Sequence, residues 1–171
     1  MRTYDQFLSL NEWFIIVTGI TAYSLIFFLP KKFTRAQTVL TLFIGIYFVV
    51  FFDHTMCVEP LDYYDVNDSN KIDIWDVLSY IMYGPFAYLF IYGYTLLRKS
   101  KSTYFFYLLV WTIFSITAEA LAWHAGVYHY RRGYRIFFSI PIYLLVLSLT
   151  MIYFQLFIRK TENKANRPSK S

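Results

Sequence analysis

Five long apolar runs dominate the sequence and limit the folds that are open to it. They cover residues 13–29, 36–52, 77–97, 103–123 and 136–158, and Glu119 is the one charged residue inside them. A helix of about 20 apolar residues crosses the hydrocarbon core of a bilayer. A soluble helical bundle does not need runs of this length. We therefore predict an all-α fold, an integral membrane bundle of five transmembrane helices.

Composition and charge agree with one membrane domain over residues 1–158, followed by a basic tail, residues 159–171. Charged residues make up 16% of the chain and aromatic residues 23%, whereas about a quarter of a soluble domain is charged. The formal net charge is +5. Because the cations flank the apolar runs, we expect the lipid bilayer, with its acidic head groups, as the partner and not nucleic acid.

The distribution of loop charges predicts the orientation. With five spans the loops alternate, and one side then collects eleven of the sixteen Lys and Arg residues together with a single acid, Glu162. These cations are Lys31, Lys32, Arg35, Arg98, Lys99, Lys101, Arg159, Lys160, Lys164, Arg167 and Lys170. By the positive-inside rule the amino terminus lies outside and the carboxyl terminus lies in the cytoplasm. We predict a multi-pass protein of the cell membrane.

The loop at residues 53–76 holds seven of the eleven acids and one cation, Lys71. It lies between the second and third runs, so the same rule places it outside the cell. Its acids are Asp53, Glu59, Asp62, Asp65, Asp68, Asp73 and Asp76. We predict a structured acidic extracellular loop.

Part of this loop has the spacing of a calcium site. Calcium loops of the EF-hand type place oxygen ligands at positions 1, 3, 5, 7, 9 and 12, and position 7 uses its carbonyl. Residues 65–76 resemble such a loop and the calcium loop of dockerin modules. The predicted calcium ligands are Asp65, Asn67, Ser69, Lys71, Asp73 and Asp76. Position 6 is Asn70 instead of glycine, and the alternative is a solvated acidic loop with ordinary turns.

Glu119 lies about three residues inside the outer end of the fourth run. Ionisable groups within a span are costly and usually face the bundle interior. Ser115 precedes Glu119 by four residues and shares its helical face. Ser115 and Glu119 therefore form a candidate intramembrane polar site for a proton or a ligand. The structural alternative is a carboxylate held by a tyrosine hydroxyl or by a nearby arginine.

Arg131, Arg132 and Arg135 form an outer-face basic cluster that breaks the positive-inside pattern. They either neutralise the acidic loop or bind an anion such as a phosphate. A third set, His54, Cys57, His124 and His129, offers zinc ligands on the same face. However, His124 and His129 are five residues apart, so they do not share a helical face. We identify no catalytic residue in the sequence.

Two segments resemble a family of small five-helix membrane proteins from spore-forming, Gram-positive-type bacteria. The first is Pro60–Tyr94, and the second is the pattern in which Glu119 is followed by Gly126, Tyr128 and Tyr130. The resemblance implies the five-helix architecture and no activity. We expect a multi-pass membrane protein whose outer loop binds calcium or another membrane or surface protein. The alternatives are a small transporter or transporter subunit that uses Glu119, and a membrane-embedded metal-dependent enzyme.

Overall fold

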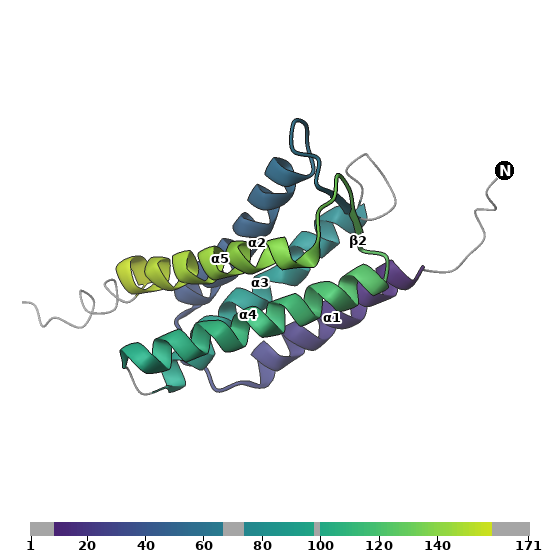
Figure 1. The fold of residues 1–171 in the computed structure, drawn as a ribbon. Coiled ribbons are helices and arrows are strands. Elements are labelled where there is room, and N and C mark those ends of the chain that lie inside the picture. Colours follow the sequence, from purple (N-terminus) through teal and green to yellow (C-terminus); the bar gives the residue numbers. More distant parts are fainter. Residues whose placement is uncertain (1–8, 67–73, 98–99, 159–171) are drawn as a thin grey trace, which may run out of the picture.

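The computed structural model describes residues 9–66, 74–97 and 100–158, which form five long helices and one small sheet (Figure 1). The long helices are α1 (Leu10–Phe28), α2 (Arg35–Met56), α3 (Ile74–Leu96), α4 (Lys101–His124) and α5 (Ser139–Tyr153). A 3₁₀ turn, η1 (Ile136–Phe138), precedes α5, and a π-helical turn, η2 (Phe154–Ile158), follows it. The five segments are long and apolar enough to span a membrane. The prediction of an all-α fold is confirmed.

Capping residues explain where three of the helices begin. The Glu12 carboxylate accepts a hydrogen bond from the Ser9 backbone N–H at 2.7 Å, at the start of α1. Thr34 and Gln37 form the reciprocal pair before α2, in which each side chain accepts from the other residue's backbone N–H. Ser100 Oγ accepts from the Thr103 backbone N–H before α4. Such caps satisfy N–H groups that have no partner inside the helix.

The helices pack in two groups. α1 and α2 both pack on α3, while α4 and α5 pack mainly on each other. α2 and α3 cross closely at Gly45 and Gly84. A Cβ on Gly45 would lie 2.9 Å from Ala87 Cβ and 3.1 Å from the Tyr83 carbonyl oxygen. Small residues allow this close approach, as is common between membrane helices.

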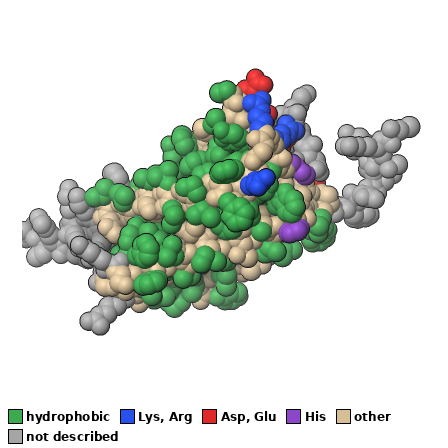
Figure 2. All heavy atoms as spheres, in the orientation of Figure 1, with side chains coloured by type: hydrophobic (Ala, Val, Ile, Leu, Met, Phe, Trp, Pro, Cys, Tyr) green, Lys and Arg blue, Asp and Glu red, His purple; other side chains and the backbone are tan. Residues whose placement is uncertain are grey.

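The polarity of the bundle is the reverse of that of a soluble protein. Thr41, Ser79, Thr112 and Thr150 are buried, whereas large apolar side chains of every long helix are exposed. Thr41 and Thr112 donate to the carbonyl oxygens of Gln37 and Leu108, so their buried hydroxyls are satisfied. On the face seen in Figure 2, hydrophobic side chains are spread along the bundle, and the visible Arg, Lys, Asp and Glu side chains lie near one end. A surface of this kind suits contact with lipid.

A short antiparallel sheet at one end of the bundle was not predicted. β1 (Tyr64–Val66) pairs with β2 (Tyr128–Tyr130), with Tyr64 opposite Tyr130 and Val66 opposite Tyr128. The sheet links the connection after α2 to the connection between α4 and α5 (Figure 1). It therefore joins the two helix groups at the end that carries the acidic segment.

The acidic segment is shorter in the structure than the predicted loop at residues 53–76. α2 continues through Asp53 to Met56, and α3 begins at Ile74, before Asp76. Asp53 and Asp76 are both buried. The apolar run therefore does not end the second helix, because Asp53 finds a hydrogen-bond donor in Tyr64 and can be buried.

Candidate functional site

Glu119 is the centre of a hydrogen-bonded group that connects α4, β2 and α5. Its side chain is 7% exposed. Its Oε1 atom accepts hydrogen bonds from the Tyr130 hydroxyl and from Ser139 Oγ, both at 2.7 Å. Ser139 Oγ also lies 2.8 Å from the Tyr134 hydroxyl. The tyrosine partner that the sequence suggested as an alternative is present.

The second carboxylate oxygen of Glu119 has a different environment. Oε2 is buried and has no hydrogen-bond partner among the described residues. Tyr143 of α5 lies near enough to interact with the carboxylate. A buried polar atom without a partner is unusual in folded proteins, and a functional role is one of the explanations for such an atom.

A cavity of about 200 Å³ lies between the two helix groups, and Glu119 forms part of its wall. All five long helices and both strands contribute lining residues. Most of the lining is apolar or aromatic, including Phe86 and Trp111. Ser115 also lines the cavity, and its hydroxyl donates to the Trp111 carbonyl at 2.9 Å. The structure thus brings the predicted pair Ser115 and Glu119 to one cavity.

Asp53 is the second carboxylate in the cavity wall, and sequence reasoning placed it in the loop instead. It is 6% exposed, and its Oδ1 atom accepts a hydrogen bond from the Tyr64 hydroxyl at 2.9 Å. The signal that could have identified it is its position at the end of an apolar run, directly after Phe51 and Phe52. Intramembrane carboxylates usually face the bundle interior.

Six tyrosines, together with Thr18, Ser139 and Thr150, form the rest of the polar lining. The tyrosines in the wall are Tyr64, Tyr83, Tyr128, Tyr130, Tyr134 and Tyr143. The hydroxyls of Tyr83 and Tyr128 bond to each other. Burial raises the pKa of Tyr64, Tyr128 and Tyr130, and the carboxylates of Asp53 and Glu119 raise it further for Tyr64 and Tyr130 respectively. These hydroxyls are therefore neutral at physiological pH and can donate hydrogen bonds.

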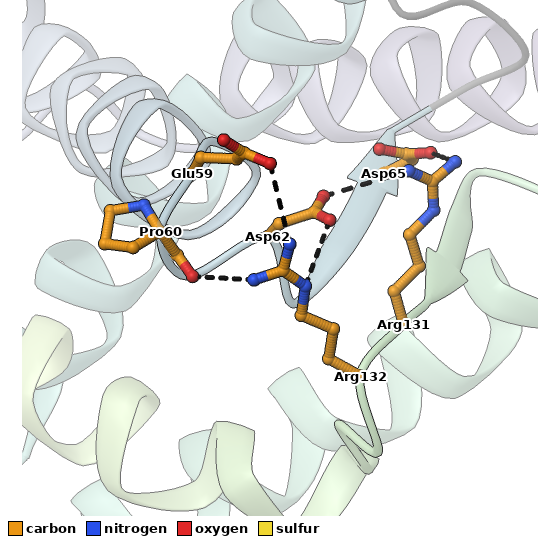
Figure 3. Close-up of polar contacts among 6 residues, drawn as sticks. All are labelled: Glu59, Pro60, Asp62, Asp65, Arg131 and Arg132. Atoms are coloured by element: carbon orange, nitrogen blue, oxygen red, sulfur yellow. Dashed lines mark hydrogen bonds and ion pairs between the residues drawn. The ribbon is translucent and has the colours of Figure 1, made fainter.

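Two arginines after β2 contact Glu59 and Asp62, which precede β1, and Asp65, which lies within β1 (Figure 3). Arg131 pairs with Asp65 and, at 3.8 Å, with Asp62. Arg132 lies 3.3 Å from Asp62 and 3.8 Å from Glu59, and it donates to the Pro60 carbonyl at 2.8 Å. These contacts fit the neutralising interpretation of the cluster.

Two of these paired residues have an unusual backbone. Asp62 has φ +43° and Arg132 has φ +48°, a left-handed conformation that is uncommon for residues other than glycine. Arg135, the third residue of the basic cluster, is exposed and directly precedes η1. The ion pairs are half-exposed, so each adds little to stability. They connect the segment before and within β1 to the residues that follow β2.

The predicted calcium ligands are only partly described. Asn67, Ser69, Lys71 and Asp73 lie outside the described residues. Asp65 lies in β1 and pairs with Arg131, and Asp76 is 7% exposed in the first turn of α3. The calcium site therefore stays a prediction.

The structure describes all four predicted zinc ligands, which come from α2, its C-cap, α4 and β2. His54 lies in the last turn of α2, and its Nδ1 lies 3.0 Å from the Val50 carbonyl oxygen. His124 ends α4 beside the Trp123 ring, and His129 lies in β2. Burial and the nearby Asp53 raise the pKa of the Cys57 thiol. Within residues 9–66, 74–97 and 100–158, no three His, Cys, Asp or Glu side chains gather as a metal site would require.

Comparison with protein-family models, curated proteins and solved structures finds no match to this chain.

Proposed function

We propose that this chain is a multi-pass membrane protein that binds a small molecule inside its helix bundle. The membrane location rests on five sufficiently long apolar helices and on their exposed apolar faces. Inward hydroxyls and outward apolar side chains are the arrangement that a bilayer favours.

The proposed orientation keeps the sheet and the acidic segment outside the cell. At the other end of the bundle, Lys31 and Lys32 lie between α1 and α2, and Arg35 begins α2. Arg131 and Arg132, which broke the positive-inside pattern, pair with acids at the sheet end. Because this pairing neutralises their charge, they do not oppose the orientation that the remaining cations favour.

The cavity is the observation that carries the functional part of the proposal. Its volume of about 200 Å³ exceeds the roughly 150 Å³ of an engineered apolar cavity that binds benzene. Its walls are mostly aromatic and aliphatic and carry a smaller number of polar groups, as in many small-molecule sites. A ligand of about one ring is therefore the expected occupant.

The transporter alternative requires a path beyond the cavity. An apolar core cluster fills the bundle toward the end that carries Lys31 and Lys32. It consists of Phe90, Ile91, Leu108, Leu147, Met151 and Phe154. Phe90 and Leu147 belong both to this cluster and to the cavity wall. The cavity is thus bounded by packed apolar side chains on that side. This favours a binding protein over an open transport path in the described conformation.

A ring-sized neutral probe tests the proposal. We expect 4-fluorotoluene to bind the full chain in nanodiscs saturably, as followed by ¹⁹F NMR against empty nanodiscs. Val146→Phe places a larger side chain in the cavity wall and should abolish the saturable component. Leu145→Phe changes the exposed neighbouring position and should preserve it.

Two outcomes would overturn the binding proposal. One is that 4-fluorotoluene only partitions into the lipid, with no saturable component in the wild type. The other is that Val146→Phe and Leu145→Phe bind the probe equally well. Circular dichroism of both variants separates a filled cavity from a loss of folding.

A further inference from the structure

The charge of the cavity wall is one-sided. Glu119 and Asp53 are both at least nine-tenths buried and both line it. No Lys, Arg or His is found among the described residues of the wall. A buried carboxylate is strongly disfavoured unless a cation or several donors compensate its charge. The described residues of the wall therefore supply no positive charge to balance the two carboxylates.

The two carboxylates differ in how far the protein satisfies them. Asp53 accepts a hydrogen bond from Tyr64, across the junction of α2 and β1. The Oε1 atom of Glu119 accepts hydrogen bonds from Tyr130 and Ser139. Its Oε2 atom has no hydrogen bond among the described residues. Tyr130 and Ser139 thus hold the carboxylate in place while one acceptor stays available. A charged N–H, such as that of an ammonium group, forms a hydrogen bond to a carboxylate about twice as strong as a neutral donor does.

Aromatic rings complete a surface that suits a cation. Trp111, Phe114, Tyr130 and Tyr134 belong to the cavity wall with Glu119. The face of an aromatic ring attracts an ammonium group, and this attraction is stronger where water is excluded. A carboxylate and several rings around one cavity are the chemistry by which proteins recognise organic ammonium ions.

We propose that the cavity takes a small organic ammonium ion of about one ring, with its charged group on Glu119 Oε2. This inference rests on the proposed function and adds the charge class of the ligand. The competing occupant is a neutral ligand with a hydrogen-bond donor. Such a ligand does not require a charged carboxylate and would bind Glu119 in its protonated form as well as in its ionised form. The comparison of a cation with a neutral analogue of the same shape therefore decides between them.

The test uses 4-fluorobenzylamine and 4-fluorobenzyl alcohol, which differ in one terminal group. Each is titrated by ¹⁹F NMR against the full chain in phosphatidylcholine nanodiscs. We expect the wild type to bind the amine at least about tenfold more tightly than the alcohol. The chain has a formal net charge of +5, so general attraction of cations to the protein would not produce this preference.

Three variants test whether Glu119 is the origin of the preference. Glu119→Gln should weaken amine binding by about tenfold or more and change alcohol binding by less than about threefold. Glu59→Gln removes the same charge from a strongly exposed residue at the same end of the bundle and should bind both probes as the wild type does. Glu119→Asp keeps the charge and should retain part of the preference, which covers the case in which Glu119→Gln does not fold.

Equal binding of the amine and the alcohol by the wild type would overturn the inference, as would an amine preference that Glu119→Gln retains. The result with 4-fluorotoluene separates the two proposals. Saturable toluene binding that Val146→Phe abolishes, without an amine preference, leaves the binding pocket in place and removes only the ammonium ligand. Absence of saturable binding of all three probes would remove both.

Discussion

At the scale of single residues, the buried carboxylates differ in how the chain supplies their donors. Asp53 receives the hydroxyl of Tyr64, which is eleven residues away along the sequence. Glu119 receives Tyr130 and Ser139, at separations of eleven and twenty residues. Both carboxylates therefore depend on connections between helices. Substitutions in those connections should therefore alter the hydrogen bonds of the two carboxylates in the cavity wall.

The Tyr64 hydroxyl predicts a loss of stability in alkaline solution. Burial and the Asp53 carboxylate raise its pKa above the usual value of 10.0. A raised folded-state pKa means that its contribution is complete below pH 10.0 and is lost as the pH rises above that value. The free energy of unfolding should then fall by up to about 1.4 kcal/mol per pH unit from this one group.

Thermal unfolding of the detergent-solubilised protein between neutral pH and about pH 12 measures this dependence. Tyr64→Phe removes one of the buried ionisable groups and should make the alkaline slope shallower, although its stability at neutral pH should be lower because Asp53 loses a donor. Tyr47→Phe changes an exposed tyrosine and should leave the slope as in the wild type. A slope that Tyr64→Phe does not alter would contradict the assignment.

At the scale of helices and connections, the contact between α2 and α3 depends on the absence of side chains. Gly45→Ala would place a Cβ 2.9 Å from Ala87 Cβ and 3.2 Å from Gly84 Cα. Backbone atoms at such distances cannot move aside without shifting a helix. We expect a loss of about 1–3 kcal/mol in the free energy of unfolding, measured by thermal denaturation in detergent.

Gly19→Ala is the matched control on α1. Its Cβ would meet only the flexible Met82 side chain at 3.8 Å, which is an ordinary contact. Because alanine favours a helix more than glycine does, the variant should be as stable as the wild type or slightly more stable. Equal effects of the two substitutions would show that the helix crossing is not sensitive to side-chain size.

The acidic connection carries the calcium prediction, which we keep as a proposal. Asp65, its first predicted ligand, pairs with Arg131, so calcium must displace an arginine. We expect weak binding, with a dissociation constant of the order of 10⁻⁴ to 10⁻³ M. Calcium at ten times that concentration should stabilise the fold by about 1.4 kcal/mol.

Thermal shift measurements with millimolar calcium test this site. Asp65→Ala should abolish the stabilisation. Asp62→Ala changes an acid that contacts the same arginine but lies outside the predicted loop, so it should preserve the calcium effect. Stabilisation of the same size in the wild type and in Asp65→Ala would mean that the segment is an acidic turn without a calcium site.

At the scale of the whole molecule, orientation in the membrane has a direct test. In a Cys57→Ser background, cysteines at Glu59 and Lys31 lie at exposed positions at opposite ends of the bundle. An impermeant maleimide applied to intact cells should label the cysteine at Glu59 and should reach the one at Lys31 only after lysis. The reverse pattern would invert the proposed orientation and place the sheet in the cytoplasm.

The sequence by itself determined the five helices, because length and apolarity are local properties of each segment. Even so, the ends of the helices depended on neighbours. Asp53 extends α2 instead of ending it because Tyr64 donates to its carboxylate. The predicted fifth run begins with a 3₁₀ turn, and α5 starts at Ser139. Apolar composition alone does not show whether a helix continues past the end of an apolar run or begins after its start.

Only the tertiary structure decided what surrounds Glu119 and where the cavity lies. β1 and β2 have three residues each, too few for an alternating pattern to stand out. Their pairing joins Tyr64 to Tyr130, which are far apart in sequence. Helical periodicity could place Ser115 and Glu119 on one face, but it could not bring Asp53 and six tyrosines to the same cavity. That arrangement depends on contacts between segments, which no local pattern encodes.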